Sequence, residues 1–374
     1  MNARKNTLSA ISLFSGAGGM DIGFERAGFK VHWSNDFDTK ACETYRSNFE
    51  NENICGPIEE SLTTLNKFAD IECLFGGPPC QGFSVAGKMD LNDPRSELVY
   101  KFMEIVETLR PKSFVMENVP SLATLSKFSE FRSQLIQKAH KLGYSIDLQI
   151  FSSAEFGVPQ DRKRMFFVGV LGDHHVDLKI RALKYLKEPV STFEAISDLG
   201  IQGTDVNPKT CNAAVTLAAY PVLRKSPYSG MLFNGAGRPI HPTRPSPTLP
   251  ASMGGNKTPI IDERLYYGDG FDWVSEYHKH LMSGGQPYPM HDTPKYIRRL
   301  TLRESSRLHG FPDEFLFCGG KSAVYRQIGN AVPPTLAEMI ALMVQDILLD
   351  EPLPITPEAN LFSNISSFRE KSLV

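Results

Sequence analysis

The sequence predicts an α/β protein: a sheet covered by helices on both faces, joined to a smaller, loop-rich domain. Over the first half of the 374-residue chain, short apolar segments alternate with helical patterns, as in proteins with a parallel sheet. From about residue 190, proline and glycine recur, and helical periodicity nearly vanishes until residue 301. The length also favours two domains, because a domain usually has roughly 150 residues.

The expected strands and helices follow one another regularly in the first half. Strands are expected at residues 10–14, 31–34, 73–77, 113–118, 145–151 and 164–170, and helices near 20–27, 39–49, 96–109 and 126–142. Later helices are expected at 301–310 and 335–348, and the second of these, with Met339 and Met343, suits packing against the first domain. The predicted boundaries are 1–192 for the first domain, completed by 325–350, then 193–324 for the second domain and hinge, and 351–374 for a poorly ordered tail.

Charge is distributed unevenly along the chain. The formal net charge is only −2, but residues 160–326 carry 22 basic and 16 acidic side chains, whereas the remainder carries 18 and 26. A basic segment in an acidic frame suits a polyanion-binding module attached to a catalytic body. Chance variation among solvated surface charges explains the same numbers equally well.

The six cysteines have neither metal-site nor disulfide-scaffold spacing, and no histidine pattern indicates a metal. Five of them are expected to be structural: Cys42, Cys55, Cys73, Cys211 and Cys318. The N-terminus lacks the features of a signal peptide, and no stretch reaches the roughly 18 uninterrupted apolar residues of a membrane span. The expectation is a cytoplasmic protein without a metal.

A glycine-rich turn follows the first expected strand. The segment SGAGG at residues 15–19 leads into an amphipathic helix, so its backbone can approach a ligand at the carboxyl edge of the sheet. A dinucleotide fingerprint would have a third glycine where Asp21 stands, which weakens the case for a nicotinamide cofactor. Asp36 ends the second strand, where an acid can accept hydrogen bonds from ribose hydroxyls. The pair indicates an adenosine-type cofactor; a purely structural glycine turn is the alternative.

A cysteine follows the third expected strand, on a turn stiffened by two prolines in GGPPCQGFS. Each proline restricts its own backbone and that of the residue before it, so the thiol of Cys80 is held near the glycine-rich turn. A thiol is a strong nucleophile when it is partly ionised. The alternative is a buried structural cysteine, the usual role of this residue type.

Two charged motifs lie at the ends of later strands. The apolar strand SFVMEN delivers Glu117 to its tip, where partial burial raises a carboxyl pKa and favours an acid catalyst; a helix cap or surface acid is the alternative. In QDRKR, the side chains of Gln160, Arg162 and Arg164 point to one side of an extended chain. Forked guanidinium groups suit planar oxygens or phosphates.

Together these motifs resemble those of the DNA (cytosine-5) methyltransferase family. The motifs that stand in the family's order are LFSGAGGMDIGFERAGF, SNDFD, GGPPCQGFS, ENV, QDRKR, LTLRESSRLHGFPDEF and QIGNAVPP. The resemblance covers roughly residues 10–170 and 297–350, and residues 193–295 correspond to the family's variable target-recognition region, with Thr248-Leu249 as its TL pair. It implies a Rossmann-like S-adenosylmethionine-dependent methyltransferase sheet in the first domain and target recognition by the second.

The resemblance also implies a cofactor site. S-adenosylmethionine is the implied methyl donor and S-adenosylhomocysteine the product. The implied binding residues are Phe14, Gly16, Gly18, Asp36, Phe37 and Asn330. The family's Gly-Asp-Ile reads Gly56-Pro57-Ile58 here, so the acid that contacts adenine is missing, and Glu59 or Glu60 is the candidate replacement.

The implied reaction methylates cytosine C5 through a covalent adduct. The Cys80 thiolate adds to C6, C5 takes the methyl group, and loss of the C5 proton with elimination of Cys80 gives 5-methylcytosine. Glu117 bonds or protonates N3, while Arg164, with Arg162 behind it, contacts O2 or holds Glu117 in register. The base must rotate out of the duplex for this chemistry.

Implied DNA contacts come from the loop after Cys80 and from the target-recognition region. The candidate residues are Gln81, Ser84, Lys88, Arg95 and Thr248. The main hypothesis is a site-specific methyltransferase of double-stranded DNA, the modification half of a bacterial restriction system. It predicts a nucleoid-associated monomer, with a cognate endonuclease that shares the site but is not a physical partner. Two alternatives stay open: an RNA cytosine-5 methyltransferase acting on transfer RNA, and a non-catalytic nucleic-acid-binding protein on the same fold.

Overall fold

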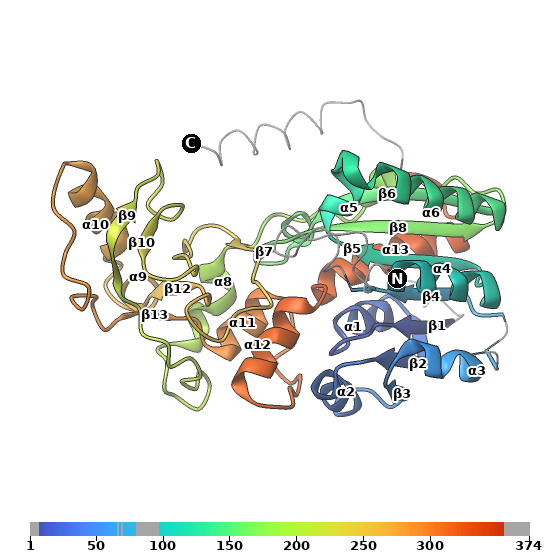
Figure 1. Ribbon diagram of the computed structural model, residues 1–374, viewed down its shortest axis with the longest axis horizontal. Coiled ribbons are helices and arrows are strands. Elements are labelled where there is room, and N and C mark those ends of the chain that lie inside the picture. Colours follow the sequence, from blue (N-terminus) through green and yellow to red (C-terminus); the bar gives the residue numbers. More distant parts are fainter. Residues whose placement is uncertain (1–6, 66, 69, 80–96, 355–374) are drawn as a thin grey trace.

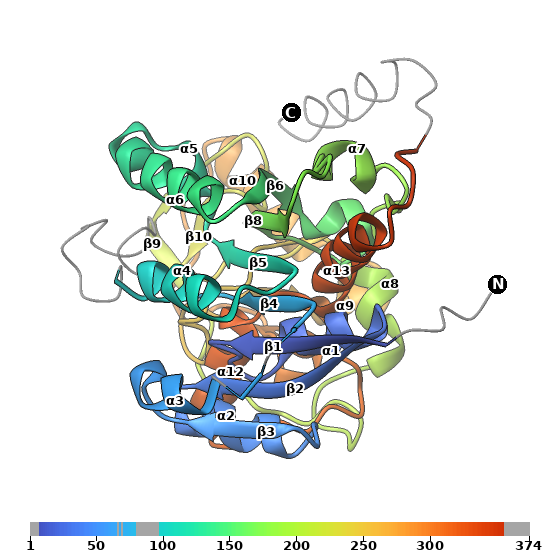
Figure 2. The ribbon, with the colours of Figure 1, turned by 90° about the vertical axis from the view of Figure 1, so that its right-hand side faces the viewer.

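A seven-stranded sheet forms the centre of the computed structural model, which describes residues 7–65, 67–68, 70–79 and 97–354 (Figures 1 and 2). The strand order is β3-β2-β1-β4-β5-β8-β6. Its strands are β1 (Leu8–Leu13), β2 (Phe29–Asp36), β3 (Glu52–Cys55), β4 (Cys73–Gly76), β5 (Ser113–Asn118), β6 (Tyr144–Ser152) and β8 (Lys163–Leu171). All six strands expected from the sequence are therefore present. The sequence prediction omitted β3, because four residues at a sheet edge carry too little periodicity.

The sheet is mixed, which corrects the prediction of a parallel sheet. Strands β3, β2, β1, β4 and β5 run parallel, but β8 is antiparallel to both β5 and β6. The reason is a short connection: β6 ends at Ser152, which pairs directly with Lys163 at the start of β8. No long helix separates the two strands, so the chain turns back beside β6 instead of crossing over to a parallel position.

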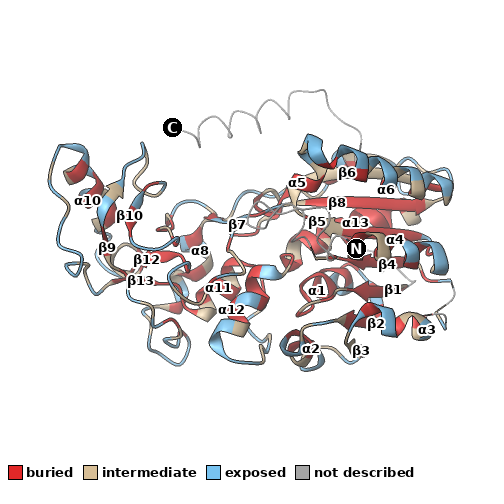
Figure 3. Cartoon of the chain, viewed as in Figure 1, coloured by how far each residue is buried: buried red, intermediate tan, exposed pale blue. Residues whose placement is uncertain are grey.

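Helices cover both faces of this sheet (Figures 2 and 3). One face packs against α1 (Gly19–Arg26) and α13 (Pro334–Leu348), and the other against α4 (Glu97–Leu109) and α6 (Ser129–Lys141). Shorter helices surround them: α2 (Thr39–Arg46), α3 (Leu62–Leu65), α5 (Pro120–Thr124) and α7 (Leu178–Ala182).

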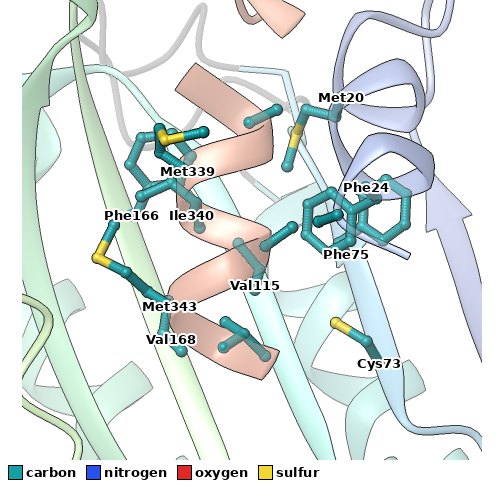
Figure 4. Close-up of a cluster of buried hydrophobic side chains, with 14 of the residues drawn as sticks. Met20, Phe24, Cys73, Phe75, Val115, Phe166, Val168, Met339, Ile340 and Met343 are labelled. Carbon is teal, nitrogen blue, oxygen red and sulfur yellow. The ribbon is translucent and has the colours of Figure 1, made fainter. Parts of the chain in front are cut away.

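Helix α13 returns from the far end of the chain into this core. It lies between side chains of α1, such as Phe24, and side chains of β8, such as Phe166 (Figure 4). Met339 is 3% exposed and Met343 0%, so their predicted place in the core is confirmed. Among the described residues, one helical stretch, Lys321–Leu348, is long and apolar enough to span a membrane, but 72% of its most apolar window is buried in the protein.

Smaller elements make up the part of the chain after β8. Strand pairs are β9 (Leu217–Val222) with β10 (Met231–Phe233), β12 (Ile260–Asp262) with β13 (Ile297–Arg299), and β7 (Gln160–Asp161) with β11 (Ser246–Pro247). The helices are α8 (Thr192–Ile196), α9 (Glu263–Tyr267), α10 (Trp273–Met282), α11 (Leu302–Leu308) and α12 (Lys321–Asn330). Two hydrophobic clusters of their own hold these elements together.

Helix α10 lies before residue 301, so the prediction that helical periodicity nearly vanishes between residues 190 and 301 is wrong. Asp272 caps the helix by accepting a hydrogen bond from the Ser275 N–H at 2.9 Å. Its buried face carries Val274, Tyr277 and Leu281, a spacing of three and four residues that was readable in the sequence. The surrounding prolines and glycines masked this short signal.

Candidate active site

The carboxyl ends of the parallel strands bring the predicted motifs to one edge of the sheet. The register pairs Leu13 at the end of β1 with Gly76 at the end of β4, and Gly76 with Met116 of β5. Because β8 runs the other way, its first residues reach the same edge: Asn118, the last residue of β5, pairs with Met165. The glycine turn, the Gly-Gly-Pro-Pro turn, Glu117 and Arg164 are therefore neighbours, as expected for a ligand site at the carboxyl edge.

The glycine turn is braced by Asp36. The Gly16 N–H donates a hydrogen bond to Asp36 Oδ2 at 2.7 Å, and the Asp38 N–H donates to Oδ1 at 2.8 Å. Burial raises the pKa of Asp36 above its ordinary value, and these backbone hydrogen bonds oppose that shift. A carboxylate has about four lone-pair sites, so this one keeps acceptor capacity for a ligand.

The surroundings of this turn fit an adenosine-type cofactor. A Cβ added to Gly16 would meet no atom within 4 Å, so the space beside the turn is open. The ring of Phe37 is 78% exposed and offers a flat apolar surface next to Asp36. Asn330 is exposed at the end of α12, and the segment after it contacts the turn: a Cβ on Gly19 would lie 2.6 Å from Val332 O.

The candidate replacements for the family's adenine-contacting acid lie just after β3, at the same edge. Asn35 Nδ2 donates a hydrogen bond to Gly56 O at 3.0 Å, which ties the segment containing Pro57 to β2. Glu59 and Glu60 are both exposed. Their role in adenine recognition stays a prediction.

Gly18 is a position of the turn that tolerates a side chain poorly. Its φ is +93°, and an added Cβ would lie 2.3 Å from the Phe49 ring. Gly18→Ala is expected to lower the free energy of unfolding by about 2–4 kcal/mol through backbone strain and overpacking. Chemical denaturation measures this; Gly16→Ala, which meets no atom, is the control and is expected to cost about half as much or less. Equal losses would show that the Phe49 contact is unimportant.

Glu117 and Arg164 form a nearly buried ion pair. Glu117 Oε1 lies 2.8 Å from Arg164 Nε, and the two side chains are only 12% and 14% exposed. Burial raises the pKa of Glu117, while the positive charges of Arg164 and Arg162 oppose the shift. A carboxyl group in this environment can hold or deliver a proton near neutral pH more readily than a solvated one.

The turn that leads to Cys80 lies against this pair. A Cβ on Gly77 would lie 2.8 Å from Glu117 Oε2, and Asn118 Nδ2 donates a hydrogen bond to Pro78 O at 3.1 Å. Cys80 itself falls outside the described residues, as do four predicted DNA contacts: Gln81, Ser84, Lys88 and Arg95. Of the five cysteines expected to be structural, Cys42, Cys73 and Cys211 are buried, and Cys55 and Cys318 are half-buried; all five are free thiols.

The QDRKR segment alternates as an extended chain should. Gln160 and Arg162 are buried at 0% and 2% exposure, whereas Asp161 and Lys163 are exposed. Arg162 binds backbone carbonyls: its Nη1 donates a hydrogen bond to Leu249 O at 3.2 Å and its Nη2 to Gly329 O at 2.8 Å. Arg162 thus joins distant segments, and Arg164 is the arginine that contacts Glu117.

Thr248 lies on the surface next to this segment. It is exposed, and its hydroxyl donates a hydrogen bond to Asp161 O at 3.0 Å. Its methyl group and the two lone pairs of its hydroxyl oxygen stay available for a ligand. A DNA contact by Thr248 stays a prediction.

Sequence reasoning gave no role to two buried polar groups in LTLRESSRLHGFPDEF. His309 is 0% exposed and contacts Gln160. Glu304, also 0% exposed, accepts hydrogen bonds from both Nη atoms of Arg298 at 2.9 and 2.8 Å. These hydrogen bonds hold the pKa of Glu304 below its usual range although burial raises it. Charged and polar residues at the apolar positions of an amphipathic helix were the available signal.

Known proteins resemble this chain over most of its length. The family described as C-5 cytosine-specific DNA methylase matches residues 8–346. The Type II methyltransferase M1.HphI of Haemophilus parahaemolyticus is 33% identical over 351 residues, which cover 90% of this chain and 86% of the relative. The Type II methyltransferase M.FnuDI of Fusobacterium nucleatum is 31% identical over 362 residues, which cover 92% and 96%.

Solved structures share the fold. A protein described as a prophage-encoded DNA modification methyltransferase of E. coli has a TM-score of 0.64 at 24% identity, covering 91% of this chain and 99% of that one. The Dnmt2 methyltransferase of S. pombe has a TM-score of 0.64 at 18% identity, covering 90% and 98%. The chain therefore shares a Rossmann-like fold with these structures, a mixed sheet with helices on both faces.

Proposed function

This chain belongs to the C-5 cytosine-specific DNA methylase family, and we propose that it methylates cytosine within one specific sequence of double-stranded DNA, with Cys80 as nucleophile. The observation that carries the assignment of residues is the nearly buried Glu117–Arg164 pair at the sheet edge, which lies against the turn that begins at Gly77, three residues before Cys80. An acid, a guanidinium and the entry to the nucleophile's turn thus share one site.

Each residue has a distinct task in this proposal. The Cys80 thiolate bonds to cytosine C6, which pushes electrons toward C5 and makes that carbon nucleophilic. Glu117 donates a hydrogen bond or a proton to N3 as charge develops on the ring, and Arg164 contacts O2 and orients Glu117. After C5 has taken the methyl group, a base removes the C5 proton, the C6–sulfur bond breaks, and the electron pair returns to Cys80. Arg162 supports Arg164 from the buried side.

S-adenosylmethionine, when bound, supplies the methyl group from its sulfonium. Phe14, Gly16 and Gly18 would hold its methionine and adenosine parts, Asp36 the ribose, and Phe37 the adenine ring, with Asn330 completing the pocket. The open space at Gly16 and the exposed ring of Phe37 support this assignment. The enzyme needs no metal in this scheme.

Asp36→Ala is expected to weaken binding of S-adenosylmethionine by about tenfold or more, because both a ligand acceptor and the brace of the glycine turn are lost. Calorimetric titration of the DNA-free protein measures the dissociation constant. Asp38→Ala is the control: it removes a helix cap that accepts from the Lys40 N–H at 2.9 Å, and is expected to lower stability by about 1 kcal/mol without weakening the cofactor. If Asp36→Ala and wild type bind S-adenosylmethionine with equal affinity, Asp36 is not part of the cofactor site.

The remaining assignments follow from this activity. Residues 1–192 with 325–350 form the catalytic domain, and 193–324 the target-recognition domain and hinge. Gln81, Ser84, Lys88, Arg95 and Thr248 contact the DNA, aided by the net positive charge of residues 160–326. The protein acts as a monomer in the cytoplasm, at the nucleoid. It protects DNA from an endonuclease that recognises the same sequence without binding the methyltransferase, as its similarity to Type II methyltransferases supports.

Transfer of a labelled methyl group separates this proposal from its alternatives. The protein is incubated with labelled S-adenosylmethionine and either duplex DNA of mixed sequence or transfer RNA. Label in DNA as 5-methylcytosine is expected, and bisulfite sequencing of DNA from expressing cells then gives the recognised sequence. Label in transfer RNA alone would overturn DNA as the substrate, and label in neither would indicate a non-catalytic protein.

A further inference from the structure

A seam with a buried interior joins three segments that are far apart in the sequence: Gln160–Arg164, Thr248–Leu249 and Gly329–Val332. Short strand β7 pairs with β11, and Arg162 donates to the carbonyls of Leu249 and Gly329. The packing at Gly329 leaves no room for a side chain, since an added Cβ would lie 2.5 Å from the backbone of Ala251. The seam therefore holds the segment with Arg162 and Arg164, the TL pair and the turn after Asn330 at fixed distances from one another.

His309, which follows α11, closes this seam with a chain of hydrogen bonds. Its ring is 0% exposed, with Nε2 at 2.9 Å from Ala331 O and Nδ1 at 3.0 Å from Gln160 Nε2. The other end of the Gln160 amide, Oε1, accepts a hydrogen bond from the Leu249 N–H at 2.9 Å. One imidazole and one amide thus connect the backbone of Leu249 to the backbone of Ala331.

The two backbone groups at the ends of this hydrogen-bond chain, Leu249 N–H and Ala331 O, determine where its protons lie. A carbonyl oxygen can only accept, so the hydrogen bond to Ala331 O requires a proton on His309 Nε2. A backbone N–H can only donate, so Gln160 Oε1 faces Leu249 and the Gln160 NH₂ group donates to His309 Nδ1. The ring must be neutral to accept at Nδ1. Burial and the nearby charge of Arg162 agree, because they hold the pKa of His309 well below its ordinary value.

We propose that His309 is a positioning residue for methyl transfer. Its neutral ring fixes the position of the Ala331–Val332 turn relative to Gln160. The Ala331–Val332 turn contacts Gly19 of the cofactor turn, and Gln160 precedes Arg162 and Arg164. Losing the ring leaves a buried amide N–H and a buried carbonyl without partners, so both the cofactor side and the catalytic side of the seam shift. The expected effect on kcat rests on the proposed function, and the expected effect on the affinity for S-adenosylmethionine rests on the proposed cofactor site.

The test compares His309→Leu with His309→Gln. Leucine removes both hydrogen bonds, whereas glutamine offers one acceptor and one donor about as far apart as the imidazole nitrogens. For His309→Leu we expect the dissociation constant for S-adenosylmethionine, titrated without DNA, to rise about tenfold and kcat to fall about tenfold or more. For His309→Gln we expect both values within about threefold of wild type. A residue that only stabilises the fold would change the thermal midpoint without this pattern of loss and rescue.

His278 provides a matched control elsewhere in the chain. It is 6% exposed, and its Nε2 lies 2.7 Å from Arg224 O. His278→Leu removes a comparable buried hydrogen bond, and we expect its affinity for S-adenosylmethionine to stay at the wild-type value. The inference is wrong if His278→Leu weakens binding of S-adenosylmethionine as much as His309→Leu does. It is also wrong if His309→Gln loses as much affinity and kcat as His309→Leu.

Gln160 supplies a second, independent variant. Gln160→Met keeps the side-chain length and removes the amide, and we expect the same rise in the dissociation constant even if His309→Leu fails to fold. In the double variant the two losses of affinity should not multiply, because both substitutions interrupt the same chain of hydrogen bonds. Multiplicative losses would overturn the inference. A wild-type protein that binds S-adenosylmethionine but methylates no DNA would refute the proposed function and leave the binding part of this inference testable.

Discussion

Replacing Cys80 with alanine is expected to abolish methyl transfer, with kcat lowered on the order of 10⁴-fold or more. Without the thiolate, C6 receives no nucleophile and C5 is too electron-poor to take a methyl group. Transfer of label to duplex DNA under single-turnover conditions measures the loss. Binding of S-adenosylmethionine is expected to be unchanged, because the variant removes only the nucleophile. Cys318→Ala, at a half-buried thiol that contacts Ser47 Oγ at 3.3 Å, is the control and is expected to keep full activity.

A modified substrate tests the same assignment chemically. With 5-fluorocytosine at the target position, the step that normally removes the C5 proton cannot occur, so the bond between sulfur and C6 persists. Mass spectrometry of the digested complex is expected to find the nucleotide on the peptide that contains Cys80. An adduct on another cysteine, or full activity of Cys80→Ala, would refute Cys80 as the nucleophile.

Replacing Glu117 with glutamine has the second-largest expected effect, a fall in kcat of about 10²- to 10⁴-fold. Glutamine can still donate a hydrogen bond to N3, but it cannot transfer a proton, and its neutral amide loses the ion pair with Arg164 at 2.8 Å. Burial raises the pKa of Glu117, so the protonated form that can donate to N3 extends to higher pH than for a solvated carboxyl. Wild-type kcat is therefore expected to fall as pH rises through that raised pKa.

The pH profile distinguishes this role from a structural one. Glutamine does not titrate, so Glu117→Gln should lack the fall of kcat with rising pH while keeping the affinity for S-adenosylmethionine. Glu72→Gln is the matched control: Glu72 precedes β4 at the opposite edge of the sheet and accepts a hydrogen bond from the Ser9 N–H at 2.8 Å. Its activity and pH profile should equal those of wild type. A Glu117→Gln profile that falls with pH as wild type does would assign the titration to another group.

Local patterns in the sequence placed most of the catalytic body correctly. Asp36 and Asn118 end their strands as expected, and the glycine and proline turns follow theirs, because side-chain periodicity and turn residues act over a few neighbours. The rule that ligand sites lie at the carboxyl edge then brought these motifs together without coordinates. The candidate acid, the arginines and the cofactor turn were all readable in this way.

Tertiary structure alone decided the direction of β8, the contacts of the two arginines and the place of His309. Arg162 bonds to carbonyls 87 and 167 residues away, and His309 lies 149 residues from Gln160. No periodicity of neighbouring residues encodes such partners, since each contact depends on how complete elements pack. The motifs therefore indicated which chemistry the chain carries, whereas long-range packing determined that Arg164 contacts Glu117 and that Arg162 and His309 bond to distant segments.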